Sequence, residues 1–155
     1  MKLMLNKQMK IGLFNKYKSD TEYCDATIEI AMETKTIDFY ENEIETLEEN
    51  IFNGLSNLKE IYFSENKIES LPENIFNGLS NLTVINFDQN NIEFLPENIF
   101  NDLSNLNDID FRNNKIESLP ENIFNGLSNL SVINLRCNKI ESLPENIFKR
   151  HSIYY

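Results

Sequence analysis

Side chains that could carry out catalysis are scarce in this sequence of 155 residues. Its one histidine, His151, lies within the last five residues, and no G-x-S-x-G, P-loop or H-E-x-x-H motif is present. Nucleophilic catalysis needs a nucleophile beside a base, so we expect no enzymatic activity and no cofactor. Asp88, Asp108 and Asp110 could hold Ca²⁺ weakly, because carboxylate oxygens are its ligands. An ordinary acidic surface is the favoured interpretation, and no metal site is predicted.

A 24-residue repeat organises the rest of the chain. The segment LPENIFNGLSNL begins at Leu71 and again at Leu119, and LPENIFNDLSNL begins at Leu95. A variant without the proline begins at Leu47, and a truncated copy begins at Leu143. A fixed period of this length is typical of a solenoid, in which each repeat stacks on the next. We therefore predict a solenoid over 34–155 with repeats at 34–57, 58–81, 82–105, 106–129 and 130–153.

Superposing the repeats separates the predicted core from the predicted surface. Apolar residues recur at 24-residue intervals from Ile37, Phe39, Ile44, Leu47 and Phe52. A single repeat cannot bury these side chains, whereas stacking gives each one a like partner above and below. At about 1.5–3 kcal/mol per buried large side chain, this is the main stabilising interaction.

One polar column interrupts the apolar pattern at the point where each predicted strand turns. A buried turn leaves backbone N–H and C=O groups without partners, and an asparagine amide offers both donors and an acceptor. We predict a structural ladder formed by Asn42, Asn66, Asn90, Asn114 and Asn138.

With these columns in place, the chain resembles the leucine-rich repeat family. The matching pattern is Leu58-x-x-Ile61-x-Phe63-x-x-Asn66-x-Ile68-x-x-Leu71-Pro72-x-x-x-Phe76-x-x-Leu79, and the resemblance covers residues 34–150. More narrowly, it is similar to the 24-residue class of Toll-type receptors, Slit-like guidance proteins and lamprey variable lymphocyte receptors. The resemblance implies an α/β repeat fold: a right-handed horseshoe-shaped solenoid with a parallel sheet on its concave face and loops or short helical turns on its convex face. It also implies a receptor-like protein-binding role and an extracellular or cell-surface location.

Strand positions that point away from the core differ from repeat to repeat, while the core columns barely change. They hold two tyrosines, an acidic middle and two arginines at one end, and Tyr and Arg are frequent binding hot spots. We predict a partner-binding concave face made of Tyr40, Glu60, Tyr62, Asn86, Asp88, Asp108, Asp110, Arg112, Asn134 and Arg136. The alternative is a solvated sheet that binds nothing.

Charge narrows the class of partner. The formal net charge is −11, from 25 acidic and 14 basic side chains. Such a field repels phosphate backbones, so we expect a protein partner and no nucleic acid. The sequence has no run of about 18 apolar residues, and no transmembrane segment is expected. Two glutamate columns, which start at Glu45 and Glu49, are predicted to be solvated flanks whose mutual repulsion is screened by salt.

Residues 1–33 are predicted to be a basic segment followed by a cap strand. Met1–Lys18 holds five lysines and no acidic residue. A short amphipathic helix is compatible with the spacing of its Leu5, Met9, Leu13 and Tyr17. This helix would cap the stack or target a membrane surface. Thr27–Met32 alternates apolar and other residues, as expected of a strand.

Two alternative functions remain open. Strands about 4.8 Å apart would place Cys24 and Cys137 about 20 Å from each other, too far for a disulfide, which needs Cα atoms within about 7 Å. Two free thiols are therefore predicted, and they favour an intracellular adaptor or recognition subunit in the cytoplasm. The other alternative is a structural element that self-associates weakly through uncapped ends, above all the C-terminal end, where residues 149–155 barely complete the fifth repeat.

Overall fold

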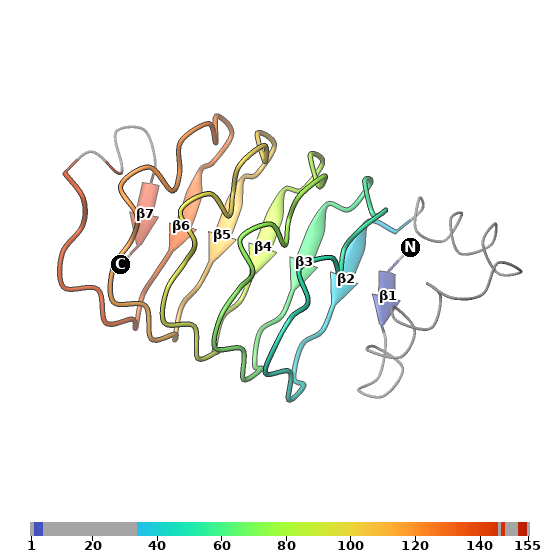
Figure 1. Ribbon diagram of the computed structural model, residues 1–155, viewed down its shortest axis with the longest axis horizontal. Helices are drawn as coiled ribbons and strands as arrows, with labels where there is room; N and C mark the ends of the chain where they lie inside the picture. The colour runs from blue at the N-terminus through green and yellow to red at the C-terminus, as the bar shows by residue number, and fades with distance from the viewer. Residues whose placement is uncertain (1, 5–33, 146, 148–151, 155) are drawn as a thin grey trace, which may run out of the picture.

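The computed structural model describes residues 2–4, 34–145, 147 and 152–154. Short strands form one parallel sheet along one side of a stack of coils (Figure 1). In sheet order they are β1 (Lys2–Met4), β2 (Thr36–Asp38), β3 (Glu60–Tyr62), β4 (Val84–Asn86), β5 (Asp108–Asp110), β6 (Val132–Asn134) and β7 (Ser152–Tyr154). Among β2 to β6, neighbouring strands pair residues that are 24 positions apart in the chain. The predicted leucine-rich repeat solenoid is confirmed.

The two outer strands do not follow the 24-residue period. β1 pairs with β2, at the edge of the sheet where the sequence analysis places the cap strand Thr27–Met32. That segment and the helix predicted over Leu5–Tyr17 lie outside the described residues. At the other end β7 pairs with β6 in a register that joins Val132 to Ser152, a step of 20 residues. A further strand of the sheet thus begins before the predicted fifth repeat (130–153) is complete, and β6 is not an edge strand.

Alternation along each strand decides which side chains enter the core. In β2–β6 the middle residue is buried and its two neighbours are half-buried. The buried middle residues are Ile37, Ile61, Ile85, Ile109 and Ile133. Successive side chains of a strand point to opposite faces, so this isoleucine column faces the core and its neighbours form the outer face of the sheet.

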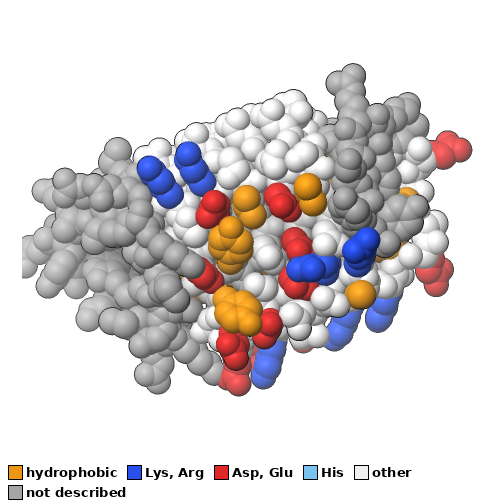
Figure 2. Space-filling model, turned by 180° about the vertical axis from the view of Figure 1, so that it is seen from behind, with side chains coloured by type: hydrophobic (Ala, Val, Ile, Leu, Met, Phe, Trp, Pro, Cys, Tyr) orange, Lys and Arg blue, Asp and Glu red, His pale blue; other side chains and the backbone are white. Residues whose placement is uncertain are grey.

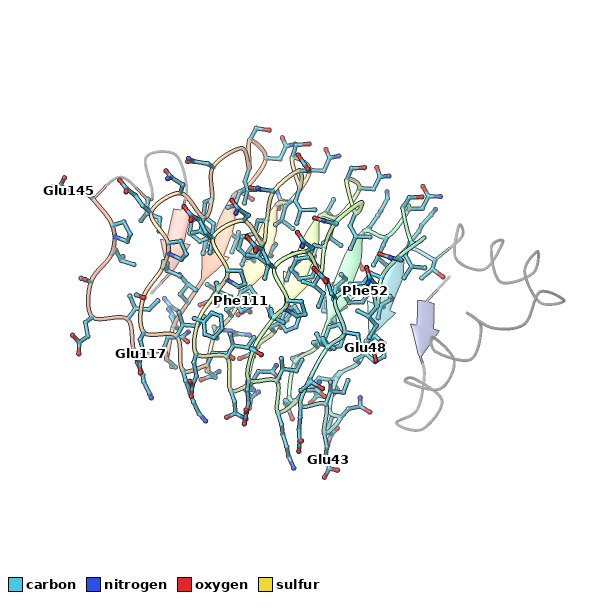
Figure 3. All side chains as sticks on the ribbon, in the orientation of Figure 1. Glu43, Glu48, Phe52, Phe111, Glu117 and Glu145 are labelled. Carbon is cyan, nitrogen blue, oxygen red and sulfur yellow. The ribbon has the colours of Figure 1, made fainter. Side chains whose placement is uncertain are left out.

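Phenylalanine forms two columns inside the stack, which meet edge to face. Phe39, Phe63, Phe87 and Phe111 stack with ring centroids 4.6–5.4 Å apart. The second column stacks at 6.1–6.4 Å and consists of Phe52, Phe76, Phe100 and Phe124. Rings of the two columns contact each other in T-shaped pairs at 6.0–6.3 Å. Phe52 and Phe111 lie inside the coils, whereas Glu43, Glu117 and Glu145 project outward (Figure 3). The stacked ring pairs and the T-shaped ring pairs are both favoured aromatic geometries.

The side of the coils opposite the sheet is built from turns. Hydrogen bonds there join alternate N–H groups to the carbonyl three residues earlier, as between Ile75 and Pro72 at 3.3 Å. No helix occurs within the described residues, and hence none that could cross a membrane. At the end of this segment Gly54, Gly78 and Gly126 have φ of 80–85°, and Asp102 takes the same place with φ of 65°.

Asparagine side chains close the turn after each strand. Asn90 Nδ2 lies 2.9 Å from the Phe63 carbonyl oxygen and 3.1 Å from that of Phe87, and Asn90 Oδ1 accepts the Ile68 N–H at 3.0 Å. The same three kinds of bond are made by Asn66, Asn114 and Asn138. The residue before each asparagine has φ of 52–59°. The ladder therefore connects neighbouring repeats and fixes the end of every strand.

Candidate functional site

The outward side chains of the sheet form one continuous surface, which we call the sheet face. It is seen in Figure 2, where hydrophobic and acidic side chains interleave across its middle. Each repeat contributes two strand residues and the second residue after the strand: Thr36, Asp38, Tyr40; Glu60, Tyr62, Ser64; Val84, Asn86, Asp88; Asp108, Asp110, Arg112; Val132, Asn134, Arg136. Because the isoleucine, phenylalanine and asparagine columns hold the backbone, these side chains can differ without changing the fold.

The N-terminal part of the sheet face is hollowed. The first two repeats line an open hollow of about 340 Å³, which we call the tyrosine hollow: Thr36, Asp38, Tyr40, Glu60, Tyr62 and Ser64. Tyr40 is 50% exposed, which makes it one of two large hydrophobic side chains that stand out into solvent among the described residues. An exposed aromatic ring beside a hollow is a common anchor point for a partner.

Hydrogen bonds hold the lining of the hollow in place. The Thr36 hydroxyl donates to Glu60 Oε2 at 3.0 Å, and the Tyr40 N–H donates to Asp38 Oδ1 at 3.0 Å. The Tyr40 hydroxyl donates to Glu65 Oε1 at 2.9 Å. That bond, together with the charge of Glu65, raises the pKa of Tyr40 above its ordinary value. The tyrosine therefore stays protonated and anchored at neutral pH.

The middle of the sheet face is a charge cluster centred on Arg112. Its Nη2 lies 3.0 Å from Asp88 Oδ2, and its Nε lies 3.0 Å from Asp110 Oδ2. Asn113 Nδ2 adds a bond of 2.8 Å to Asp88 Oδ1. Asp88 is only 8% exposed. The sequence analysis expected Asp88 to face solvent, and its burial contradicts this: Arg112 and Asn113 of the next repeat cover it. Its role in binding stays a prediction.

Burial shifts the acidity of the two aspartates on β5. It raises the pKa of Asp110, although the neighbouring Arg112 opposes the shift. Burial also raises the pKa of Asp108, with a further contribution from the charge of Asp110. In the strand register Asp108 lies between Val84 and Val132, so apolar side chains replace part of its water.

Comparison with known proteins places this geometry in a family. The BspA-type leucine-rich repeat region matches residues 29–154 in six copies. The chain belongs to this family of leucine-rich repeat proteins. Proteins of this fold are commonly interaction modules. A search of curated proteins found no significant sequence match.

Solved structures of leucine-rich repeat proteins superpose on this one. The Drosophila Toll–Spatzle complex, described as a molecular hub in development and innate immunity, matches with a TM-score of 0.68 and 28% identity over 76% of this chain. A leucine-rich repeat protein of Leptospira interrogans matches with a TM-score of 0.69 and 26% identity over 83%. The APL1 leucine-rich repeat domain matches in fold, with a TM-score of 0.72 and 21% identity over 76%. The aligned regions span only 16%, 33% and 31% of those chains.

The predicted binding residues of this leucine-rich repeat protein fall into two groups and a remainder. Tyr40, Glu60 and Tyr62 line the tyrosine hollow. Asp88, Asp110 and Arg112 form the central cluster. The Oδ1 atoms of half-buried Asn86 and Asn134 accept N–H bonds from Asp88 and Arg136, and Asp108 and exposed Arg136 complete the set.

Three residues of the surface were missed from the sequence. Glu65 anchors Tyr40, and Asn113 covers Asp88. Phe94, eight residues after the end of β4, is 56% exposed at a repeat position that holds serine or threonine in the other four repeats. Such a break in an otherwise uniform column could have been read from the sequence, whereas the partners of Tyr40 and Asp88 depend on side-chain orientation.

The described residues contain no cluster of three ligand-type side chains that could hold a metal. The carboxylates of Asp88 and Asp110, which were considered as Ca²⁺ ligands, both face the Arg112 guanidinium. Cys137 is exposed and forms no disulfide, whereas Cys24 lies outside the described residues. All described members of the two glutamate columns are exposed.

Proposed function

We propose that this protein is a non-enzymatic recognition module that binds a protein partner through the sheet face. The observation that carries the proposal is the contrast within one chain between constant core columns and a sheet face that changes from repeat to repeat. Membership of a family whose members are commonly interaction modules supports it. Toll, a protein of similar fold, was solved in complex with Spatzle.

The sheet face has the features of a protein interface. Interfaces combine aromatic and arginine anchors with a polar surround. Here Tyr40 and Tyr62 lie at the N-terminal end of the sheet face, and Arg112 and Arg136, in the fourth and fifth repeats, lie toward its C-terminal end. Arg112 is fixed by two ion pairs, so Arg136, which is more exposed, is the better arginine for a mutational test.

Quantitative affinity capture from an extract of the source organism tests the proposal. The double variant Tyr62→Ala/Arg136→Ala removes one anchor from each end of the sheet face. A matched control, Glu73→Ala/Glu121→Ala, changes two exposed residues on the turn side. We expect the double variant to lose the partners captured by the wild type while the control keeps them, with both variants folded by circular dichroism. Partners retained by the double variant and lost by the control would refute binding through the sheet face.

The similarity to Toll supports an extracellular or cell-surface location. An intracellular adaptor is the second candidate, and the exposed thiol of Cys137 favours it, because such thiols persist in reducing compartments. Labelling intact cells with a membrane-impermeant maleimide separates the two. Labelled Cys137 on the cell surface supports the receptor-like role, and labelling only after lysis supports the adaptor.

A further inference from the structure

We infer that Asp108, on β5 of the sheet face, binds a lysine side chain presented by an extended segment of the partner protein. The inference rests on the proposed recognition function and names the chemistry of the partner at one position. It concerns β4, β5 and β6, which read Val-Ile-Asn, Asp-Ile-Asp and Val-Ile-Asn. The two flanking strands are thus identical in sequence, and β5 differs from them only at its two outward positions, where it has aspartates.

The two aspartates of β5 have different surroundings. Asp110 contacts a guanidinium, since Arg112 Nε lies 3.0 Å from its Oδ2. The carboxylate of Asp108 has no hydrogen-bond or ion-pair partner within the described residues. Asp108 is half-buried, and burial raises its pKa, as does the charge of Asp110. Its ionised carboxylate has therefore lost part of its water without gaining a counter-charge in the described part of the chain. A cation from a partner supplies that counter-charge.

The residues beside Asp108 favour lysine as the source of the cation. Val84 and Val132 pair with Asp108 in the strand register, so they border it on both sides. Figure 2 shows acidic and hydrophobic side chains interleaved in this way across the sheet face. A lysine lays its methylene chain along apolar surface and keeps its ammonium at a polar group. An arginine gains by stacking on aromatic rings, and the two valines offer none.

Two asparagine amides flank β5 on the same face. Asn86 Oδ1 accepts the Asp88 N–H at 2.9 Å, and Asn134 Oδ1 accepts the Arg136 N–H at 3.4 Å. These bonds use the oxygen of each amide, and neither Nδ2 has an acceptor within the described residues. β4 and β6 lie two strand spacings apart, about 10 Å, which equals about three residues of an extended chain. The two Nδ2 groups can therefore donate to main-chain carbonyls of one extended segment that carries the lysine.

A peptide titration followed by NMR tests the inference on the full chain. The probe is acetyl-Gly-Ser-Gly-Lys-Gly-Ser-Gly-amide, and two matched controls carry Nε-acetyl-lysine or arginine in place of the lysine. Asp108→Asn removes the charge with little change of shape, and Glu121→Gln removes a charge from an exposed residue on the turn side. We expect amide shifts concentrated in residues 84–86, 108–110 and 132–134, weaker binding of both control peptides, and a loss of about two- to fivefold in affinity for Asp108→Asn alone.

The inference is overturned if either control peptide binds as tightly as the lysine peptide, or if the shifts centre on residues 36–62. Equal losses for Asp108→Asn and Glu121→Gln would also overturn it, because they would indicate diffuse attraction to an acidic protein. The proposed function fails separately. If capture of the partner depends on Tyr62 and Arg136 but is unchanged by Asp108→Asn, the sheet face binds a partner and the assignment of lysine to Asp108 is wrong. If capture ignores the sheet face altogether, the proposed function itself is wrong.

Discussion

The asparagine ladder allows a quantitative test of what holds the repeats together. Replacing Asn90 by Ala removes a side chain that is 7% exposed and that bonds to two repeats. Its Oδ1 is the acceptor for the Ile68 N–H at 3.0 Å. Its Nδ2 donates to the carbonyl oxygens of Phe63 and Phe87 at 2.9 and 3.1 Å. The cost of the substitution depends on which of these groups keeps another partner.

The two carbonyl groups do keep one, because each accepts from two successive asparagines. Phe63 O also receives Asn66 Nδ2 at 2.9 Å, and Phe87 O also receives Asn114 Nδ2 at 2.9 Å. The buried Ile68 N–H loses its acceptor, at a cost of about 1–3 kcal/mol. With about 0.5 kcal/mol for each carbonyl bond lost, the expected decrease in the free energy of unfolding is about 2–4 kcal/mol. The N–H group accounts for most of it.

Asn42→Ala is the matched control. Asn42 is half-buried, and within the described residues its amide donates only to carbonyls of its own repeat, those of Phe39 and Tyr40. We expect its loss to cost about 1 kcal/mol. Urea denaturation followed by circular dichroism measures both variants, with unchanged dependence on denaturant showing that the same surface is exposed. Equal losses for the two variants, or a loss below about 1 kcal/mol at Asn90, would refute the argument that cross-repeat bonding dominates.

Three further predictions concern stability. Burial raises the pKa of Asp108 in the folded protein, so its ionised form destabilises the fold, and this cost appears as pH rises through the acid range. Asp108→Asn should therefore raise the free energy of unfolding at pH 7 by less than about 1 kcal/mol and leave it unchanged near pH 3. A larger gain in the free energy of unfolding at low pH would contradict this sign. Asp102→Gly should stabilise by about 0.5–1 kcal/mol and Gly126→Asp should destabilise comparably, because both sites need positive φ; melts of the two variants that shift in the same direction would contradict it. Moderate salt should raise the melting temperature by screening a net charge of −11, and a melting temperature that falls steadily with salt would count against this.

The repeat period predicted the regular part of the fold because each column has one physical role. Isoleucine every 24 residues can only bury itself if the strands stack in register, and the structure pairs Ile37 with Ile61 and Ile61 with Ile85. The 24-residue period does not predict the two outer strands. Lys2–Met4 belongs to no repeat, and Ser152–Tyr154 follows β6 by 20 residues, so a period of 24 says nothing about either.

The repeat period also explains why the burial of Asp88 was not predicted. Asp88 shares its repeat position with Tyr40, Ser64, Arg112 and Arg136, and period alone treats all five as outward-facing. Its burial depends on a guanidinium from the next repeat that reaches back to within 3.0 Å, and on an amide 25 residues away. Such a contact is a property of one pair of side chains. A pattern shared by every repeat cannot contain it.

The charge cluster around Arg112 and the tyrosine hollow differ in how much a substitution costs the fold. At the centre, Asp88, Asp110 and Arg112 satisfy one another, so a change at any one leaves a half-buried charge with fewer partners and costs stability. In the tyrosine hollow, the half-buried Thr36 donates one hydrogen bond to Glu60, and its loss would break no ion pair. The N-terminal half of the sheet face can therefore change its specificity at little cost to the fold, while the middle is tied to the fold.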